Sequence, residues 1–289
     1  MEAVSCGKLS PVFFGSALTN FGVETFLQHF LTMTTSPLPR TADCGVIDPM
    51  TEDFSAFVFK IQANMNKAHR DRIAFMRICS GKFDAGMEVY HVQGDKKMRL
   101  SQPQQMMAQD RHIVEEAYAG DIIGVFDPGI FSIGDTVCTP GNKFAYEGIP
   151  TFAPEHFARV RLLDSMKRKQ FVKGVNQIAQ EGAIQIFQEF NTGMEEIIVG
   201  VVGVLQFDVL KYRLENEYNV EIRMDNLPYE HIRWIENEDI NMDKIVGTSD
   251  MKKIQDLKGR PLLLFVNSWS VGMVLDRNEG LVLSEFGRE

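Results

Sequence analysis

The sequence lacks the motifs by which P-loop enzymes hold a nucleoside triphosphate. Such a site needs a glycine-rich loop that wraps the phosphates, followed by Lys and then Ser or Thr, as in GxxxxGK[ST]. This pattern occurs nowhere in the 289 residues, and the Gly-Lys pairs at 7–8 and 81–82 lack both the upstream glycine and the following hydroxyl residue. The guanine signature NKxD is missing as well, because the Asn-Lys pair at 66–67 is followed by Ala and His. The sequence therefore predicts no catalytic residue for GTP or ATP hydrolysis.

Metal-binding and disulfide patterns are absent too. The six histidines include no HExxH motif and no paired spacing, so we expect no metal site. No GxSxG nucleophile elbow is present. The cysteines are few, far apart and never arranged as CxxC: Cys6, Cys44, Cys79 and Cys138. We interpret this pattern as a reduced, cytoplasmic chain with partly buried thiols.

Long apolar runs and an excess of positive charge are also missing. With no apolar stretch of about 18 residues and no basic segment followed by an apolar block at the start, we expect neither a membrane span nor a signal peptide. The net charge of −9 and the pI near 5.3 argue against a general nucleic-acid coat protein and against DNA as a partner. A local basic patch on an acidic body remains compatible with these numbers, because charge distribution decides that question.

The first forty residues predict one strand and one helix. The apolar run at 11–16 is typical of a buried strand, and apolar residues at 23, 26, 27, 30 and 31 share one helical face. Asn20 is a possible N-cap, and Pro37 and Pro39 end the helix. Two elements cannot make a domain, so we interpret 1–40 as the last strand and helix of a larger unit.

The next hundred residues carry only strand signals. Glycine-bearing turns separate short runs at 54–61, 73–79, 87–93, 97–100, 113–118 and 121–126, and Gly134-Asp135-Thr136 begins one more. Short strands with regular turns favour a small closed β-barrel, because closure removes exposed edges. The Gly- and Pro-rich stretch at 140–154 is typical of a linker.

After this stretch the pattern becomes mixed α and β. We expect strands at 157–163, 184–190, 197–202, 220–224 and 229–235, with helices from Asp164 or Ser165 to about Gly182 and over 205–218. The inner face of the first helix would hold Met166, Phe171, Val175 and Ile178. This order predicts a ferredoxin-like α/β sandwich. In the tail we expect a helix over 249–257, a strand over 262–266, a helix or turn, and a strand over 281–286.

Two features of the sequence are candidates for binding a ligand or partner. The strand at 11–16 ends in Gly15-Ser16-Ala17, a tight loop whose backbone N–H groups can point at a ligand, although spacing alone favours a plain turn. Basic residues cluster on the β region and on the helix after it, where they could neutralise phosphates or form a solvated face paired with Asp71 and Asp95. The residues are Lys67, His69, Arg70, Arg72, Lys96, Lys97, Arg99, Lys167, Arg168, Lys169 and Lys173. The sequence alone favours neither alternative for them.

Longer motifs closely resemble one family. The segments FVFKIQANM at 57–65, HRDRIAFMR at 69–77, IVGVVGVLQFDVL at 198–210 and EYNVE at 217–221 are similar to bacterial peptide chain release factor three, a branch of the translational GTPases. The resemblance is strong from Pro11 to about Trp234 and loose in the tail. It implies a remnant of a G domain at 1–40, an elongation-factor-like β-barrel at 41–150 and an α+β release-factor domain at 151–289.

The resemblance also implies a function. In the full-length parent, Ser16, Ala17 and Leu18 would form the last guanine-contacting loop, and GTP or GDP with Mg would be the cofactor. For this chain we expect no cofactor, no metal and no enzyme activity. It would bind ribosomal RNA and protein at the factor site and so promote dissociation and recycling of class I release factors. Lys67, His69, Arg70, Arg72, Lys167, Arg168, Lys169 and Lys173 are the expected RNA contacts.

Three alternatives stay open at this point. The chain could complement a separate G domain and act as a GTPase. It could be the rear half of another elongation-factor-G-like GTPase. Its two domains could also be a structural brace for the G domain, in which the basic clusters contact nothing.

Overall fold

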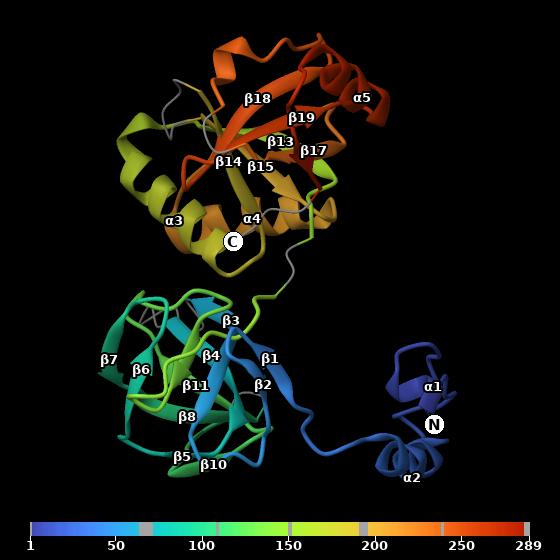
Figure 1. Cartoon of the computed structure of the whole chain (residues 1–289), viewed down its shortest axis with the longest axis vertical. Coiled ribbons are helices and arrows are strands. Elements are labelled where there is room, and N and C mark those ends of the chain that lie inside the picture. Colours follow the sequence, from blue (N-terminus) through green and yellow to red (C-terminus); the bar gives the residue numbers. More distant parts are fainter. Residues whose placement is uncertain are drawn as a thin grey trace.

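Two eight-stranded antiparallel sheets form the framework of the protein (Figure 1). The computed structural model describes residues 2–63, 72–107, 110–149, 152–190, 196–237 and 240–285. Figure 1 shows α1 (Glu2–Ser5) and α2 (Val23–Met33) apart from both sheets, joined to the first by an extended stretch before β1. The three parts follow one another along the sequence.

The N-terminal part differs from its prediction. The helix is present as α2, but residues 11–15 form no strand, and only Ser16 and Phe21 make a single bridge. A strand must exchange its N–H and C=O groups with a neighbour, and among the described residues none lies beside this run. Asn20 is not the N-cap; Gly22, with φ 73°, precedes the helix and supplies no side-chain cap. No side chain of α2 is buried.

The two long central strands of the first sheet, β3 and β4, carry β-branched and aromatic residues, which suit a pleated surface buried on one or both faces. Its order is β7-β6-β12-β3-β4-β11-β8-β9, with β3 and β4 in register at Val58 and Met76. The strands are β3 Ser55–Ala63, β4 Arg72–Ser80, β6 Glu88–His91, β7 Lys96–Arg99, β8 Ser101–Met107, β9 Asp110–Ile113, β11 Ile122–Phe126 and β12 Thr136–Cys138. Two short pairs accompany it: β1 Arg40–Ala42 with β2 Gly45–Ile47, and β5 Lys82–Asp84 with β10 Glu116–Tyr118.

This sheet curls around one apolar core into a barrel-like body (Figure 1). Phe54, Phe83 and Phe131 lie at its centre. The predicted closed barrel is only partly correct, because the end strands β7 and β9 are not paired with each other among the described residues. The sequence prediction also missed the hairpin of β8 and β9, because the seven residues of β8 are rich in Gln and Met and the four of β9 are mostly polar.

The predicted linker at 140–154 begins later than expected. Phe144 and Tyr146 are buried beside Ala42 and Phe57, and the Tyr146 hydroxyl lies 2.6 Å from the Ser55 hydroxyl. Apolar burial of two aromatic rings outweighs the turn-forming composition of this stretch. The residues up to 146 therefore belong to the first body.

The second sheet begins with the strand–helix–strand–strand–helix–strand order expected from the sequence. The elements are β13 His156–Leu162, η1 Ser165–Lys167, α3 Arg168–Gln180, β14 Gln185–Glu189, β15 Glu196–Val201, α4 Leu205–Tyr218 and β16 Ile222–Leu227. The four strands pair as β16-β13-β15-β14, the arrangement of a split βαβ unit. Asp164 caps η1, while α4 ends at Asn219 in the left-handed conformation. Phe171, Val175 and Ile178 are buried as predicted, whereas Met166 is 90% exposed.

The tail extends this sheet by four strands in the order β14-β18-β19-β17-β20. They are β17 His231–Ile235, β18 Met251–Asp256, β19 Pro261–Phe265 and β20 Leu283–Ser284, together with η2 Met242–Lys244 and α5 Ser268–Arg277. The predicted helix at 249–257 is wrong, because β18 pairs on both sides, with β14 and with β19. Two ladders of backbone hydrogen bonds override the local helix propensity of this segment.

Candidate functional site

The loop at residues 15–22 is a tight, backbone-determined turn. The N–H of Ser16 donates to the carbonyl of Phe21 at 2.9 Å, and Asn20 and Gly22 have φ of 56° and 73°. A Cβ at Gly22 would lie 2.5 Å from the carbonyl oxygen of Phe14, so only glycine fits there. This close packing turns the residues between 16 and 21 outward, and Leu18 is 96% exposed.

This loop lines a hollow of about 430 Å³ with the start of α2. Phe13 contributes to its wall and packs edge-on against Phe26, with ring centroids 5.4 Å apart. Within the described part of the chain, the backbone N–H groups of Ala17 and Leu18 have no hydrogen-bond acceptor, whereas that of Ser16 is used internally. Of these two residues Ala17 lines the hollow, and a free N–H group beside an aromatic wall can hold a planar ligand with a carbonyl acceptor.

The basic residues fall into three groups with different surroundings. Lys67, His69 and Arg70 lie outside the described residues. On β7, Lys97 pairs with Glu88 at 3.4 Å. On η1 and α3 lie Lys167, Arg168, Lys169 and Lys173.

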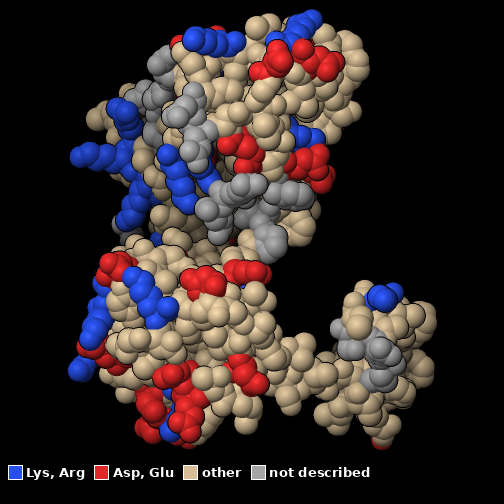
Figure 2. All heavy atoms as spheres, viewed as in Figure 1, with Lys and Arg blue, Asp and Glu red and all other residues tan. Residues whose placement is uncertain are grey.

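The α3 group forms a basic surface. Lys169 and Lys173 are four residues apart, so they share a face of the helix, and both are exposed. Of the described residues, no carboxylate pairs with Lys167, Lys169 or Lys173. Figure 2 shows Lys and Arg side chains gathered on the side of the second body where Figure 1 places α3. Unpaired ammonium groups on one face can neutralise phosphates of a nucleic-acid backbone.

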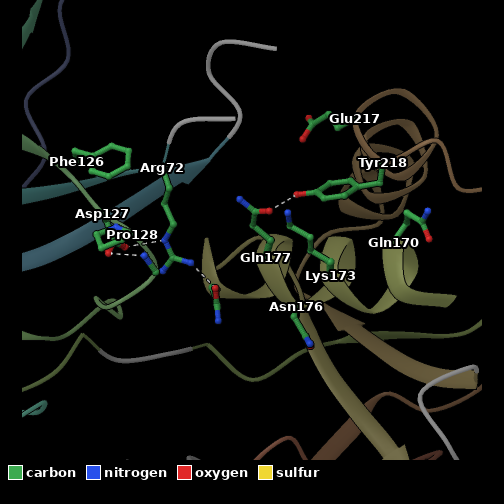
Figure 3. A pocket seen from close by; sticks show the side chains of 12 residues that line it. Arg72, Phe126, Asp127, Pro128, Gln170, Lys173, Asn176, Gln177, Glu217 and Tyr218 are labelled. Carbon is green, nitrogen blue, oxygen red and sulfur yellow. Dashed lines mark hydrogen bonds and ion pairs between the residues drawn. The ribbon is translucent and has the colours of Figure 1, made fainter. Parts of the chain in front are cut away.

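Arg72 occupies a different position, at the junction of the two bodies (Figure 3). Its Nε donates to Asp127 at 2.7 Å, its Nη2 donates to the Phe131 carbonyl at 2.7 Å, and its Nη1 donates to Gln180 on α3. The Arg72 side chain is 12% exposed and that of Asp127 is fully buried. With its guanidinium committed to these acceptors, Arg72 is not available to phosphates, and we no longer count it among the RNA contacts.

Asp127 is held by the turn that follows β11. Its second carboxylate oxygen accepts from the N–H groups of Gly129, Ile130 and Phe131 at 2.9, 2.7 and 3.3 Å. A buried carboxylate is tolerated only when its lone pairs are satisfied in this way. The sequence pattern Asp-Pro-Gly at 127–129 indicated a turn, but not that its aspartate would pair with a residue 55 positions earlier.

A polar pocket of about 440 Å³ lies beside this ion pair. In Figure 3 the loop of the first body faces α3, and the end of α4 closes the far side. From α3 it is lined by Gln170, Lys173, Asn176, Gln177 and Gln180, and from α4 by Glu217 and Tyr218. The Tyr218 hydroxyl donates to Gln177 at 2.7 Å. Lys173 therefore belongs both to the basic surface of α3 and to this pocket.

The ends of the two helices are fixed to each other by a second ion cluster. Arg213 on α4 contacts Glu181 at 2.7 Å and Glu217 at 2.8 Å, and all three side chains are largely buried. Burial acts to lower the pKa of Arg213, but its hydrogen bonds with Glu181 and Glu217 outweigh that effect and raise the pKa above the usual value for arginine. These contacts join the end of α3, the helix that carries the basic surface, to α4.

Two kinds of feature are missing from the described residues. No helix among them is both long enough and apolar enough to cross a bilayer. No group of three or more His, Cys, Asp or Glu side chains among them could hold a metal ion.

Comparison with known proteins places this geometry in a family. Residues 53–140 match the family model of elongation factor G domain 2, and residues 146–275 match that of the C-terminal domain of class II release factor RF3. Both regions are translation-factor domains, which gives the class of the protein. Within that class the chain belongs to the peptide chain release factor 3 family.

The named relatives agree with this assignment. The chain is 58% identical over 276 residues to peptide chain release factor 3 of Symbiobacterium thermophilum, a match that covers 96% of this chain and 52% of the relative. It is 48% identical over 286 residues to the same factor of Gloeobacter violaceus, covering 99% and 54%. For Streptococcus mutans the identity is 48% over 285 residues, covering 98% and 55%. The chain thus spans about half the length of the curated relatives it matches.

Proposed function

We propose that this chain is the ribosome-binding portion of a translation-termination GTPase, acting in the cytoplasm to promote dissociation and recycling of class I release factors after peptide release. The observation that carries the proposal is the basic surface of α3, where Lys167, Lys169 and Lys173 have no carboxylate partner in the described part of the chain. It lies within the region that matches the release-factor C-terminal domain. Such a surface binds phosphates by charge, without reading sequence.

Each of the three parts of the chain has a different proposed role. We propose that 1–40 belongs to a G domain, that 41–150 is the elongation-factor-like barrel, and that 151–289 is the α+β domain. The two N–H groups of Ala17 and Leu18 would meet guanine in a complete G domain, with GTP or GDP and Mg as the cofactor there. We propose that this chain by itself does not hydrolyse GTP, because its sequence holds neither GxxxxGK[ST] nor NKxD.

Ribosome binding is tested by charge reversal on α3. The variant Lys169→Glu/Lys173→Glu should pellet with purified ribosomes about tenfold less at low salt, and its salt slope should fall by about one per lost phosphate contact. The matched control is Lys8→Glu/Lys258→Glu, which makes the same charge change at two other exposed lysines. Equal losses in the two variants would mean a general charge effect, and unchanged binding would remove α3 from the interface.

In the alternative role the two bodies only brace a G domain and the basic clusters contact nothing; the hydrogen bond from Arg72 to Gln180 joins the two bodies to each other and does not decide between the roles. The same pelleting experiment separates the two roles, because a pure brace binds ribosomes equally with and without the α3 lysines. Titration with a fluorescent GDP analogue tests the expectation that this chain holds no nucleotide cofactor, and saturation at micromolar concentration would contradict that expectation.

A further inference from the structure

The outer face of α4 carries exposed apolar side chains that no described part of the chain covers. Leu205, Val209 and Tyr212 are 73, 48 and 62% exposed, and their spacing of four and three residues puts them on one side of the helix. Val202 and Val204 extend this stripe into the loop before the helix. We name these five residues the α4 stripe.

The loop part of the stripe is held firmly in its exposed position. The side-chain oxygen of Gln206 accepts from the N–H groups of Val202 and Gly203, both at 3.0 Å. The amide nitrogen of Gln206 donates to the carbonyl of Ala183 at 2.8 Å. Because these bonds hold the loop in place, its exposed valines are available for contact at low entropic cost.

A groove of about 740 Å³ continues the stripe toward the ends of β13 and β16. Apolar side chains make up much of its wall: Val204, Phe207, Met224, Leu227, Pro228 and Tyr229. Its rim is acidic. Glu155, Asp208 and Glu230 line it, are exposed, and enter no ion pair among the described residues, while the single ammonium group that lines it is that of Lys211.

We propose that the α4 stripe and this groove are a docking surface for a polypeptide segment that carries lysine or arginine beside apolar side chains. Apolar anchors would cover the stripe, and the basic groups would meet the three carboxylates. Phosphates of a nucleic acid would be repelled by the same carboxylates, so the surface is opposite in character to the basic face of α3. The proposal does not depend on ribosome binding by α3.

The test uses the whole chain and short fluorescent peptides of equal length. One peptide combines leucine with lysine, the second replaces leucine by serine, and the third replaces lysine by glutamate; a single-stranded RNA oligonucleotide is the fourth probe. The leucine–lysine peptide should saturate in a fluorescence-anisotropy titration, at least about tenfold more tightly than the other probes. RNA that binds as tightly and displaces the peptide would overturn the choice of a protein partner.

Variants then locate the site. Leu205→Ser/Tyr212→Ser removes two anchors and should weaken peptide binding by about tenfold or more. Asp208→Asn/Glu230→Gln should weaken it and flatten its salt dependence. The matched control is Trp269→Ser on α5, another large apolar side chain that is 69% exposed.

The outcomes are decisive in each case. All the changed positions are exposed, and circular dichroism melting curves verify that the variants fold. Equal binding by wild type and by the Leu205→Ser/Tyr212→Ser variant would refute the site, as would no binding of the leucine–lysine peptide up to about 1 mM. Loss of binding in the Trp269→Ser control would show that the peptide binds a different face of the protein, which would refute the proposed site.

Discussion

Replacing Arg72 by leucine should destabilise the first body and loosen its junction with the second. The substitution removes an ion pair with Asp127, a bond to the Phe131 carbonyl, and the bond to Gln180 that joins the two bodies. Asp127 would remain fully buried, without its counter-charge.

The magnitude follows from what is left behind. Breaking a buried pair by removing one partner costs about 3–5 kcal/mol, because the other charge stays uncompensated. Asp127 keeps three backbone N–H donors and Arg72 is partly solvated, so the lower end applies. We expect a loss of about 3 kcal/mol in the free energy of unfolding, roughly a hundredfold in the equilibrium constant.

The assay exploits the positions of the two tryptophans. Trp234 and Trp269 both belong to the second body, so their fluorescence follows that body alone, while far-UV circular dichroism follows both. In urea, Arg72→Leu should move the circular dichroism transition to lower concentration much more than the fluorescence transition. Gln180→Ala is the matched control, since it removes only the bond between the bodies and should cost about 1 kcal/mol or less.

Two results would refute this reasoning. A cost below about 1 kcal/mol would mean that the backbone N–H groups alone satisfy Asp127. Equal shifts of the two transitions would mean that the bodies unfold as one unit. Removing both charges, in Arg72→Leu/Asp127→Asn, should restore part of the stability, because the buried carboxylate is then neutral.

Two further predictions concern the first body. Burial raises the pKa of Tyr146 to about 12, so the folded state keeps this proton above the pH at which the unfolded chain loses it, and stability should fall by about 1–2 kcal/mol as pH rises from about 10 to 12. Tyr146→Phe should reduce that slope in denaturation curves measured across this range; an unchanged slope would assign it to other groups. Gly81→Ala should cost about 2–4 kcal/mol, since φ is +66° and a Cβ would lie 2.6 Å from backbone atoms of Glu52 and Asp53. Gly86→Ala, also at positive φ but with open space around it, should cost only about 1 kcal/mol in the same urea experiment.

Local patterns predicted the elements that local forces determine. The helix at 205–218 is present with the predicted ends, because its apolar spacing and the following Asn219 act within a few residues. The run at 11–16 and the segment at 249–257 were wrong for the opposite reason. Whether each becomes a strand depends on neighbours: the first has none among the described residues, and the second has β14 and β19.

The candidate sites show the same division. The spacing of Lys169 and Lys173 on one helical face could be predicted from the sequence, and the exposed side chains are found there. The burial and hydrogen-bond partners of Arg72 could not be predicted in this way, since its acceptors lie 55 to 108 residues away in the sequence. The α4 stripe was also missed, because in a helix that is apolar on several sides, periodicity does not tell the buried face from the exposed one.

The pairing of β14 with β18 determines where the chain can be truncated without exposing a sheet edge, and how much of it must be synthesised before the second body can fold. Without β18, the open edge of β14 would present unsatisfied N–H and C=O groups beside Phe187, a side chain that packs with Ile254 and Leu262 from the tail. Such an edge is a template for aggregation. A polypeptide truncated just before residue 251, or one still being synthesised at that point, would therefore have an unfinished sheet and tend to aggregate. Expression boundaries for the second body should lie beyond β19.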